Sequence, residues 1–208
     1  MSFRQFVALV LSVFALAVGG TASAAEYGFK DLLKDPGVPR LGAEAPDVTI
    51  VMYGDYNCGF CKRMEPVLAD ALKTDRKLAV VHKDWPIFGD VSEHAARVAL
   101  AATYQGQYEA VHRAFMLSPT RLSDKAMVEV VAKQSGVDWP RLTRDLKTHG
   151  GDIDAILARN GREAGLLSLQ GTPGLVINGY LIRGALSGEE LTGVLQKIRA
   201  AVTKSPAA

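Results

Sequence analysis

A single pair of cysteines constrains this chain of 208 residues more than any other feature. Cys58 and Cys61 are separated by Gly59 and Phe60, and the sequence holds no third cysteine. A disulfide between them would close a ring of four residues, which stabilises a fold by only about 2 kcal/mol on the chain-entropy model. Structural disulfides usually close longer loops. The spacing of the pair therefore indicates a chemically reactive role rather than a structural disulfide.

The composition is that of an ordinary globular protein, with 48% hydrophobic and 22% charged residues. It excludes an extended disordered tail, a collagen-like repeat and a disulfide-dense miniprotein. The 24 basic and 22 acidic residues nearly balance, so no strong field attracts nucleic acid or an anionic membrane. We expect no nucleic acid partner, no charged groove, and a recognition surface built of backbone and apolar side chains.

Residues 1–25 have the pattern of an export signal. Arg4 supplies a positive start, Val7 to Val18 form an apolar segment of 12 residues, and Ala22-Ser23-Ala24 precedes the cleavage site. Twelve helical residues reach about 18 Å, whereas the hydrocarbon core of a bilayer is roughly 30 Å thick. We therefore expect cleavage after Ala24 or Ala25 rather than an uncleaved anchor. The remaining chain of about 183 residues buries roughly 70% of its extended surface, enough to fold without a staple.

Two β-rich runs flank the cysteines. Val48 to Tyr53 and Leu78 to His82 both read as short buried strands. Between them, apolar residues at helical spacing predict a helix that begins at or just before Cys58: Met64, Val67, Leu68, Ala71 and Leu72. A β-α-β unit of this kind needs a parallel strand pair and a right-handed crossover.

From Ser92 to about Gly165 the apolar period is helical throughout. Five successive apolar stripes predict five helices, with turn residues between them: Gly106, Ser118-Pro119, Gly136 and Gly150-Gly151. One stripe consists of Tyr108, Val111, His112 and Phe115. The segment is therefore predicted to be an all-helical unit inserted between two β regions.

The β pattern returns near the end of the chain. Leu175 to Ile177 and Tyr180 to Arg183 flank Asn178-Gly179, a dipeptide suited to a type I′ hairpin turn. An amphipathic helix follows, with Ser187 as its N-cap and Glu190 as the capping-box partner. One mixed sheet results. The expected organisation is a lead-in over 26–46, a sheet domain over 47–91 and 166–203, and a helical insertion over 92–165.

The predicted position of the cysteines gives them different roles. Cys58, at the helix N-terminus, faces unpaired backbone amides and the positive end of the helix dipole, which stabilise a thiolate. Cys61, one turn further in, is expected to be the more buried partner that resolves a mixed disulfide. Gly59 and Phe60 add no charge, so helix and burial alone tune the pair.

The motif around the cysteines resembles a known family. The run DYNCGFCKRMEP from Asp55 to Pro66, the helical insertion and the GTPG run from Gly171 to Gly174 are similar to DsbA-like thiol:disulfide oxidoreductases of the thioredoxin superfamily. Within that family they look most like the periplasmic branch that includes the suppressor-of-copper-sensitivity C (ScsC) proteins. The resemblance covers nearly all of the chain after the export signal.

The resemblance implies an α/β thioredoxin fold, with a mixed central sheet and an all-helical insertion, in a periplasmic protein. It implies that Cys58 attacks, that Cys61 resolves, and that Pro173 is a cis proline facing the pair, with Thr172 before it. The backbone of Thr172 would then be a docking edge for an extended substrate. Gly174 departs from the family pattern, in which a residue with a side chain is commoner, and we expect it to alter the shape of the groove.

The implied activity is dithiol-disulfide exchange in exported proteins, as an oxidase or as an isomerase or reductase. The redox-active pair Cys58-Cys61 would be the sole cofactor. Implied partners are unfolded or misoxidised exported proteins and a membrane redox partner, DsbB-like or DsbD/ScsB-like. The alternative from another class is a periplasmic copper-tolerance protein that holds Cu(I) between the same two soft thiolates. A structural zinc site needs four ligands, and the second cysteine pair is absent, so we expect no metal centre.

Three further groups of residues have two interpretations each. Asp55 and Lys83 lie at matching ends of the first two predicted strands. They either form a partly buried ion pair that tunes the pKa of Cys61 or are solvated surface charges. Phe60, Trp85 and Pro86 either form an apolar rim that receives unfolded clients or, for Trp85, pack in the core. The four histidines are scattered and are most simply surface or core residues: His82, His94, His112 and His149.

Overall fold

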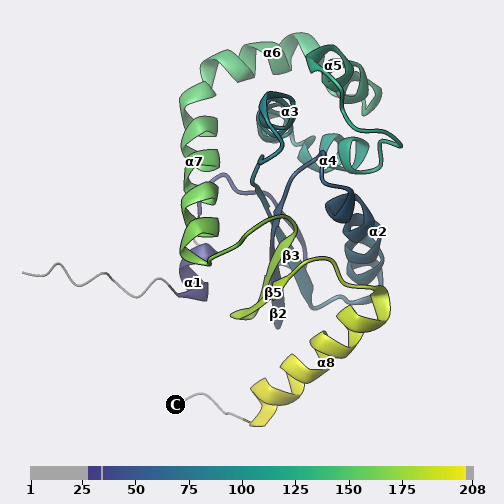
Figure 1. Cartoon of the computed structure of the whole chain (residues 1–208), viewed down its shortest axis with the longest axis vertical. Coiled ribbons are helices and arrows are strands. Elements are labelled where there is room, and N and C mark those ends of the chain that lie inside the picture. The colour runs from purple at the N-terminus through teal and green to yellow at the C-terminus, as the bar shows by residue number, and fades with distance from the viewer. Residues whose placement is uncertain (1–27, 34, 205–208) are drawn as a thin grey trace, which may run out of the picture.

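The computed structural model describes residues 28–33 and 35–204, in which five strands form one mixed sheet (Figure 1). The export signal predicted for residues 1–25 lies outside the described residues. The strand order is β1-β3-β2-β4-β5, with β2 parallel to β3 and every other neighbouring pair antiparallel. The strands are β1 (Arg40–Gly42), β2 (Val48–Gly54), β3 (Leu78–Asp84), β4 (Gly174–Ile177) and β5 (Tyr180–Arg183).

The two central strands are buried along their whole length. In β2, Ile50 and Met52 face one core cluster, whereas Val51 and Tyr53 face the other. This alternation follows from the two-residue period of a strand. Both faces of the sheet must therefore be covered, which explains why the strands read as continuous apolar runs.

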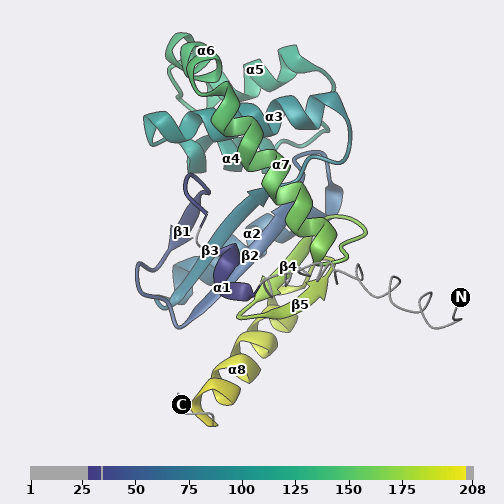
Figure 2. The ribbon, with the colours of Figure 1, turned by 90° about the vertical axis from the view of Figure 1, so that its left-hand side faces the viewer.

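Four helices cover the sheet. Helices α2 (Gly59–Thr74) and α8 (Gly188–Lys204) pack on one face. The short α1 (Phe29–Leu32) and the C-terminal part of α7 (Gly150–Leu166) contribute Leu32 and Ala164 to the core on the other face. Figure 2 shows α7 running across the front of the sheet on that second face.

The helical insertion lies over one end of the sheet, as Figure 1 shows. It consists of α3 (Asp90–Ala101), a 3-10 turn η1 (Ala102–Gln105), α4 (Tyr108–Met116), α5 (Lys125–Gln134), α6 (Trp139–Thr148) and α7. The predicted break near Gly150-Gly151 is confirmed within one residue, because His149 separates α6 from α7 and the two glycines are the first residues of α7. No helix among the described residues is long and apolar enough to cross a membrane.

The closing hairpin has the turn expected from its sequence. Asn178 and Gly179 both have positive φ, 45° and 94°, as a type I′ turn requires. The Asn178 side chain also accepts a hydrogen bond from the Thr49 amide (2.9 Å) and donates one to the Asp47 carbonyl (3.0 Å). At the start of α8, the amides of Ser187 and Glu190 donate to each other's side chains, which confirms the capping box.

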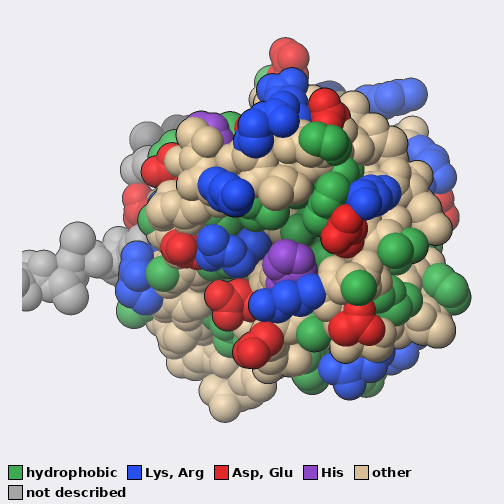
Figure 3. All heavy atoms as spheres, turned by 90° about the horizontal axis from the view of Figure 1, so that it is seen from above, with side chains coloured by type: hydrophobic (Ala, Val, Ile, Leu, Met, Phe, Trp, Pro, Cys, Tyr) green, Lys and Arg blue, Asp and Glu red, His purple; other side chains and the backbone are tan. Residues whose placement is uncertain are grey.

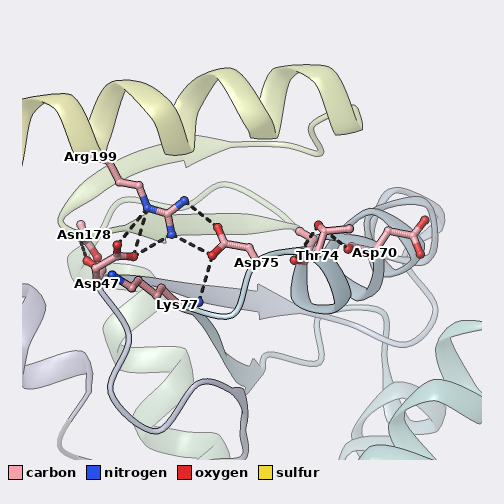
Figure 4. Close-up of polar contacts among 8 residues, drawn as sticks. Asp47, Asp70, Thr74, Asp75, Lys77, Asn178 and Arg199 are labelled. Atoms are coloured by element: carbon pink, nitrogen blue, oxygen red, sulfur yellow. Dashed lines mark hydrogen bonds and ion pairs between the residues drawn. The ribbon is translucent and has the colours of Figure 1, made fainter.

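An arginine joins the last helix to the rest of the fold (Figure 4). The guanidinium of Arg199 on α8 donates to the carboxylates of Asp47, just before β2, and Asp75, just after α2, with shortest distances of 2.7 Å to each. Asp75 also accepts from the Lys77 amide at 3.1 Å. The cluster therefore links three segments that are far apart in the sequence.

Candidate redox site

Cys58 lies where β2 ends and α2 begins. Its amide donates to the carbonyl of Asp55 (3.1 Å), and its side chain is the N-cap of α2, accepting from the Cys61 amide at 3.4 Å. Asn57 ties the same loop to the helical insertion through two hydrogen bonds with the Leu122 backbone, of 2.8 and 3.2 Å. The helix start and the insertion together therefore hold the cysteine in place.

The carboxylate of Asp55 holds this loop in place through hydrogen bonds. Its carboxylate is buried and accepts four hydrogen bonds, from the backbone amides of Asn57, Ile87 and Phe88 and from the Ser92 hydroxyl, at 2.7 to 3.1 Å. These bonds join the segment before Cys58 to the segment that connects β3 to α3. Asp55 is therefore a positioning residue of the site.

The two cysteines are free thiols with opposite electrostatic environments. The pKa of the Cys58 thiol is lowered to about 5, chiefly because the Cys61 thiol donates to its sulfur. The Thr172 hydroxyl and the amides of Cys61 and Phe60 add to this effect, and burial opposes it. The pKa of Cys61 is raised well above its ordinary value, because its proton is held by Cys58 and because it is buried. Cys58 is therefore the thiolate and Cys61 the proton-bearing partner.

Thr172 and Pro173 face the pair from the opposite half of the sheet domain. Their peptide bond is cis, and the Thr172 carbonyl oxygen lies 3.2 Å from the Cys58 sulfur, which donates to it when Cys58 is protonated. The Thr172 hydroxyl oxygen is buried and lacks a hydrogen-bond partner among the described residues. It can donate to the sulfur once Cys58 is a thiolate.

A steric contact explains why position 174 is a glycine, which is the departure from the family pattern. A Cβ atom at this position would come within 2.6 Å of the two terminal carbons of Leu169. The glycine therefore lets β4 begin directly against Leu169, next to the cis proline.

The predicted ion pair between Asp55 and Lys83 is wrong. Lys83 is fully buried, and its ammonium binds the carboxylates of Asp35 and Glu163. Its side chain lies on the sheet face covered by α7, because Lys83 is in register with Tyr53, whose hydroxyl also donates to Glu163 (2.8 Å). Strand alternation thus places Lys83 and Cys61 on opposite faces of the sheet.

The apolar rim beside Cys58 has different members from those expected. Phe60 is 56% exposed, and it is joined by Ile87 and Phe88, which are 40% and 46% exposed. Trp85 instead packs against the core cluster under α7. Neither Trp85 nor Pro86 lines the cavity beside Cys58.

Sequence reasoning missed a buried polar cluster behind the site. His112 lies between Tyr56, which precedes Cys58 by two residues, and Glu65 on α2, at 3.0 and 3.1 Å. The rings of His82 and His112 are 4.2 Å apart, and burial lowers the pKa of His82. The sequence feature that could have indicated this cluster is the position of His112 within the apolar stripe of α4. Burial raises the pKa of Asp84, at the end of β3, to about 7.

The described residues contain no group of three or more His, Cys, Asp or Glu side chains arranged to hold a metal ion. What the geometry does assemble is a dithiol with one activated sulfur, at a helix N-terminus, beside a cis proline. This arrangement has the features that dithiol-disulfide exchange in a thioredoxin fold requires.

Residues 49–196 match the family model described as the DSBA-like thioredoxin domain, and the chain belongs to this family. Solved structures that are similar include the following three. A thioredoxin-like oxidoreductase from Silicibacter pomeroyi is 34% identical, with 81% of this chain and 96% of that chain covered and a TM-score of 0.76. A periplasmic thioredoxin-like protein from Salmonella enterica is 30% identical (81% and 94% covered, TM-score 0.71). The catalytic domain of Proteus mirabilis ScsC is 27% identical (81% and 93% covered, TM-score 0.71).

Among curated proteins, the chain is similar to part of a much longer one. The Na(+)/H(+) antiporter NhaA 1 of Salinispora arenicola is 28% identical over 155 residues, which are 73% of this chain and 23% of the antiporter. The chain thus spans about a quarter of the length of the curated relatives it matches.

Proposed function

We propose that this protein is a periplasmic thiol:disulfide oxidoreductase that acts on exported proteins through Cys58 and Cys61. The observation that carries the proposal is the asymmetry of the pair, in which the pKa of Cys58 is lowered to about 5 while that of Cys61 is raised. An attacking thiolate and a resolving thiol need this asymmetry. The export signal expected for residues 1–25 and the periplasmic relative from Salmonella support the location.

The proposed reaction has two exchange steps. The Cys58 thiolate attacks one sulfur of a client disulfide, which forms a mixed disulfide and releases the other client sulfur as a thiolate. Cys61 then loses its proton and attacks the Cys58 sulfur, which releases the second client thiol and leaves Cys58 and Cys61 oxidised. The same steps in reverse, starting from the oxidised pair, place a disulfide in the client. No redox group besides the cysteine pair is proposed.

Thr172 would dock the client. In this proposal the backbone on either side of the cis proline pairs with an extended client segment, and the exposed ring of Phe60 contacts its apolar side chains. A membrane redox partner, DsbB-like or DsbD/ScsB-like, would restore the starting state of the pair. Which of the two it is depends on the direction of electron flow.

Equilibration of the pair against glutathione tests the proposal. The reference range runs from about −120 mV for DsbA to about −270 mV for thioredoxin, and a measured potential assigns oxidase, isomerase or reductase. Activity on scrambled and on reduced client proteins is measured in parallel. Tight, stoichiometric Cu(I) binding without activity on either client would contradict the proposal and favour the copper-handling alternative.

A further inference from the structure

Two cavities adjoin each other near the cysteine pair, and the larger of them is lined by Cys58. One of about 800 Å³ lies between Phe60, Phe88 and Thr172, and one of about 370 Å³ continues past Pro173. They share four lining residues, Phe60, Gln170, Gly171 and Thr172. We call the two together the Cys58 groove.

The charged residues that line the Cys58 groove are all basic: Lys62, Arg63, Arg121 and Arg183. No Asp or Glu lines it among the described residues. The whole chain has 24 basic and 22 acidic residues, so the groove is far more positive than the protein. The expectation that the molecule has no charged groove is therefore wrong.

The arginines of the rim are held by aromatic rings rather than by carboxylates. The guanidinium carbon of Arg63 lies 4.2 Å from the ring centre of Phe60, and that of Arg121 lies 5.7 Å from the ring centre of Phe88. Neither has an ion-pair partner within the described part of the chain. Elsewhere, Arg97, Lys133 and Arg199 are paired with acidic side chains.

The other two cations are also without a carboxylate among the described residues. The Lys62 ammonium donates to the carbonyl oxygens of Phe115 (2.6 Å) and Ser118 (3.2 Å), near the C-terminal end of α4. Within the described ranges, Arg183 donates to the Leu167 carbonyl alone, at 3.5 Å. Asp55 is buried and its carboxylate already accepts four hydrogen bonds.

From this arrangement we infer that the Cys58 groove prefers client segments with acidic residues beside the reacting cysteine. The inference rests on the proposed function and names its substrate class. A guanidinium stacked on a ring keeps its N–H edge free for bidentate contact with a carboxylate. Cations that line one cleft also raise the local concentration and the association rate of an anionic partner. The exposed rings of Phe60 and Phe88 supply the apolar part of the contact.

The test uses three matched peptides. Each has one cysteine, present as a mixed disulfide with neutral mercaptoethanol, and differs only at the two positions on either side, which are Glu, Gln or Lys. The second-order rate constant for reduction by the dithiol form of the protein is measured at 20 and 500 mM salt. Each value is divided by the rate constant with neutral dithiothreitol, because flanking charge changes the intrinsic reactivity of the peptide disulfide.

The normalised rate constant of the Glu peptide should exceed that of the Lys peptide by about tenfold at low salt, and the ratio should fall several-fold at high salt. The double variant Arg63→Gln with Arg121→Gln should reduce the low-salt ratio to near one. The matched control is Arg144→Gln with Lys147→Gln on α6, which removes the same charge. Both positions belong to α6, in the insertion. On the face of the molecule seen from above in Figure 3, basic and acidic side chains are interspersed.

Equal normalised rates for the three peptides, or a ratio that both double variants lower equally, would overturn the inference and leave the proposed function standing. If no peptide reacts faster with the protein than with the Cys58→Ala variant, the proposed function itself fails. The two failures are therefore distinguishable.

Discussion

The carbonyl oxygen of Thr172 lies 3.2 Å from the sulfur of Cys58, although 114 positions separate the two residues in the sequence. The helical insertion accounts for most of that separation. The two halves of the sheet domain meet through the antiparallel pairing of β2 with β4, and this pairing brings the cis proline to the start of α2. The sheet therefore assembles the site, and the insertion holds it through Asn57 and Leu122.

The two cysteines should give opposite results when each is removed. Cys58→Ala should abolish exchange with client disulfides, because the remaining thiol is buried and keeps its proton. Cys61→Ala should accumulate mixed disulfides with clients, because no second thiol releases them. Non-reducing gel electrophoresis and mass spectrometry of client complexes measure both. Trapping by Cys58→Ala instead would show that the roles are reversed.

The thiolate of Cys58 should titrate near pH 5, and its absorbance at 240 nm in the reduced protein measures this. Cys61→Ala should move the midpoint upward, because the Cys61 thiol is the largest cause of the lowered pKa. Cys61→Ser keeps a hydroxyl donor and should move it less. Equal midpoints in the wild type and in Cys61→Ala would contradict the assignment.

The same lowered pKa makes the stability of the reduced protein depend on pH. The folded value of about 5 lies below the ordinary value of about 8.5 for an unfolded cysteine. The contribution of Cys58 to stability is therefore complete above about pH 8.5 and is lost as the pH falls through 5. The oxidised protein lacks this contribution, so the stability difference between the two forms should change over that range in urea unfolding.

The hydroxyl of Thr172 should stabilise the Cys58 thiolate. Thr172→Val keeps the shape of the side chain but removes the donor, so the midpoint of the Cys58 titration should rise. Thr172→Ser retains the hydroxyl and serves as the control. A valine variant with an unchanged midpoint would show that the buried hydroxyl has no electrostatic role.

Phe60 should contribute to client binding rather than to folding. Phe60→Ala removes an exposed ring beside Cys58 and the surface on which Arg63 stacks, so KM for a reduced client should rise several-fold, with the melting temperature nearly unchanged. The control is Tyr180→Ala on β5. Tyr180 is 58% exposed, against 56% for Phe60, but it does not line the Cys58 groove. Equal effects of the two substitutions would argue against a rim at Phe60.

Arg199 should stabilise the fold without affecting the chemistry. Arg199→Ala removes the hydrogen bonds to Asp47 and Asp75 and should lower the free energy of unfolding by about 1 to 2 kcal/mol, since the cluster is partly exposed. Arg199→Lys, which keeps the charge but not the bidentate geometry, should lose less. Client turnover should stay unchanged in both.

The Arg199 effect should also depend on pH. The hydrogen bond from Arg199 is the largest cause of the lowered pKa of Asp75. Its stabilisation is present above the unfolded value of about 3.9 and is lost as the pH falls through the lower folded value. The stability gap between the wild type and Arg199→Ala should therefore narrow in urea unfolding as the pH falls below the unfolded value of about 3.9.

Features that depend on neighbouring residues were predictable from the sequence. The hairpin at Asn178-Gly179 and the capping box of Ser187 and Glu190 formed as expected, because turn dihedrals and helix caps are decided within a few residues. The start of α2 at the cysteine pair is of the same kind. The break between α6 and α7, directly before Gly150-Gly151, is also of this kind.

The side chains around the site were harder to predict. Lys83 turned to the other face of the sheet, towards Glu163 on α7. Trp85 took the second of its two predicted places, in the core under α7. His112 and Glu65 met behind the site from separate helices. Each outcome depends on which elements cover which face, and a single sequence without contacts does not contain that information.

The sequence alone indicated the cysteine pair, the order of strands and helices from β2 onward, and the closing hairpin turn, because these depend on composition and on spacing along the chain. It did not predict α1 or β1 in the lead-in. Only the tertiary structure decided the environment of Cys58. The Thr172 carbonyl and the four cations of the groove come from the region around α2, from the insertion and from the β4-β5 half of the sheet domain. Their charges act through space, so a nearly neutral composition conceals a basic groove.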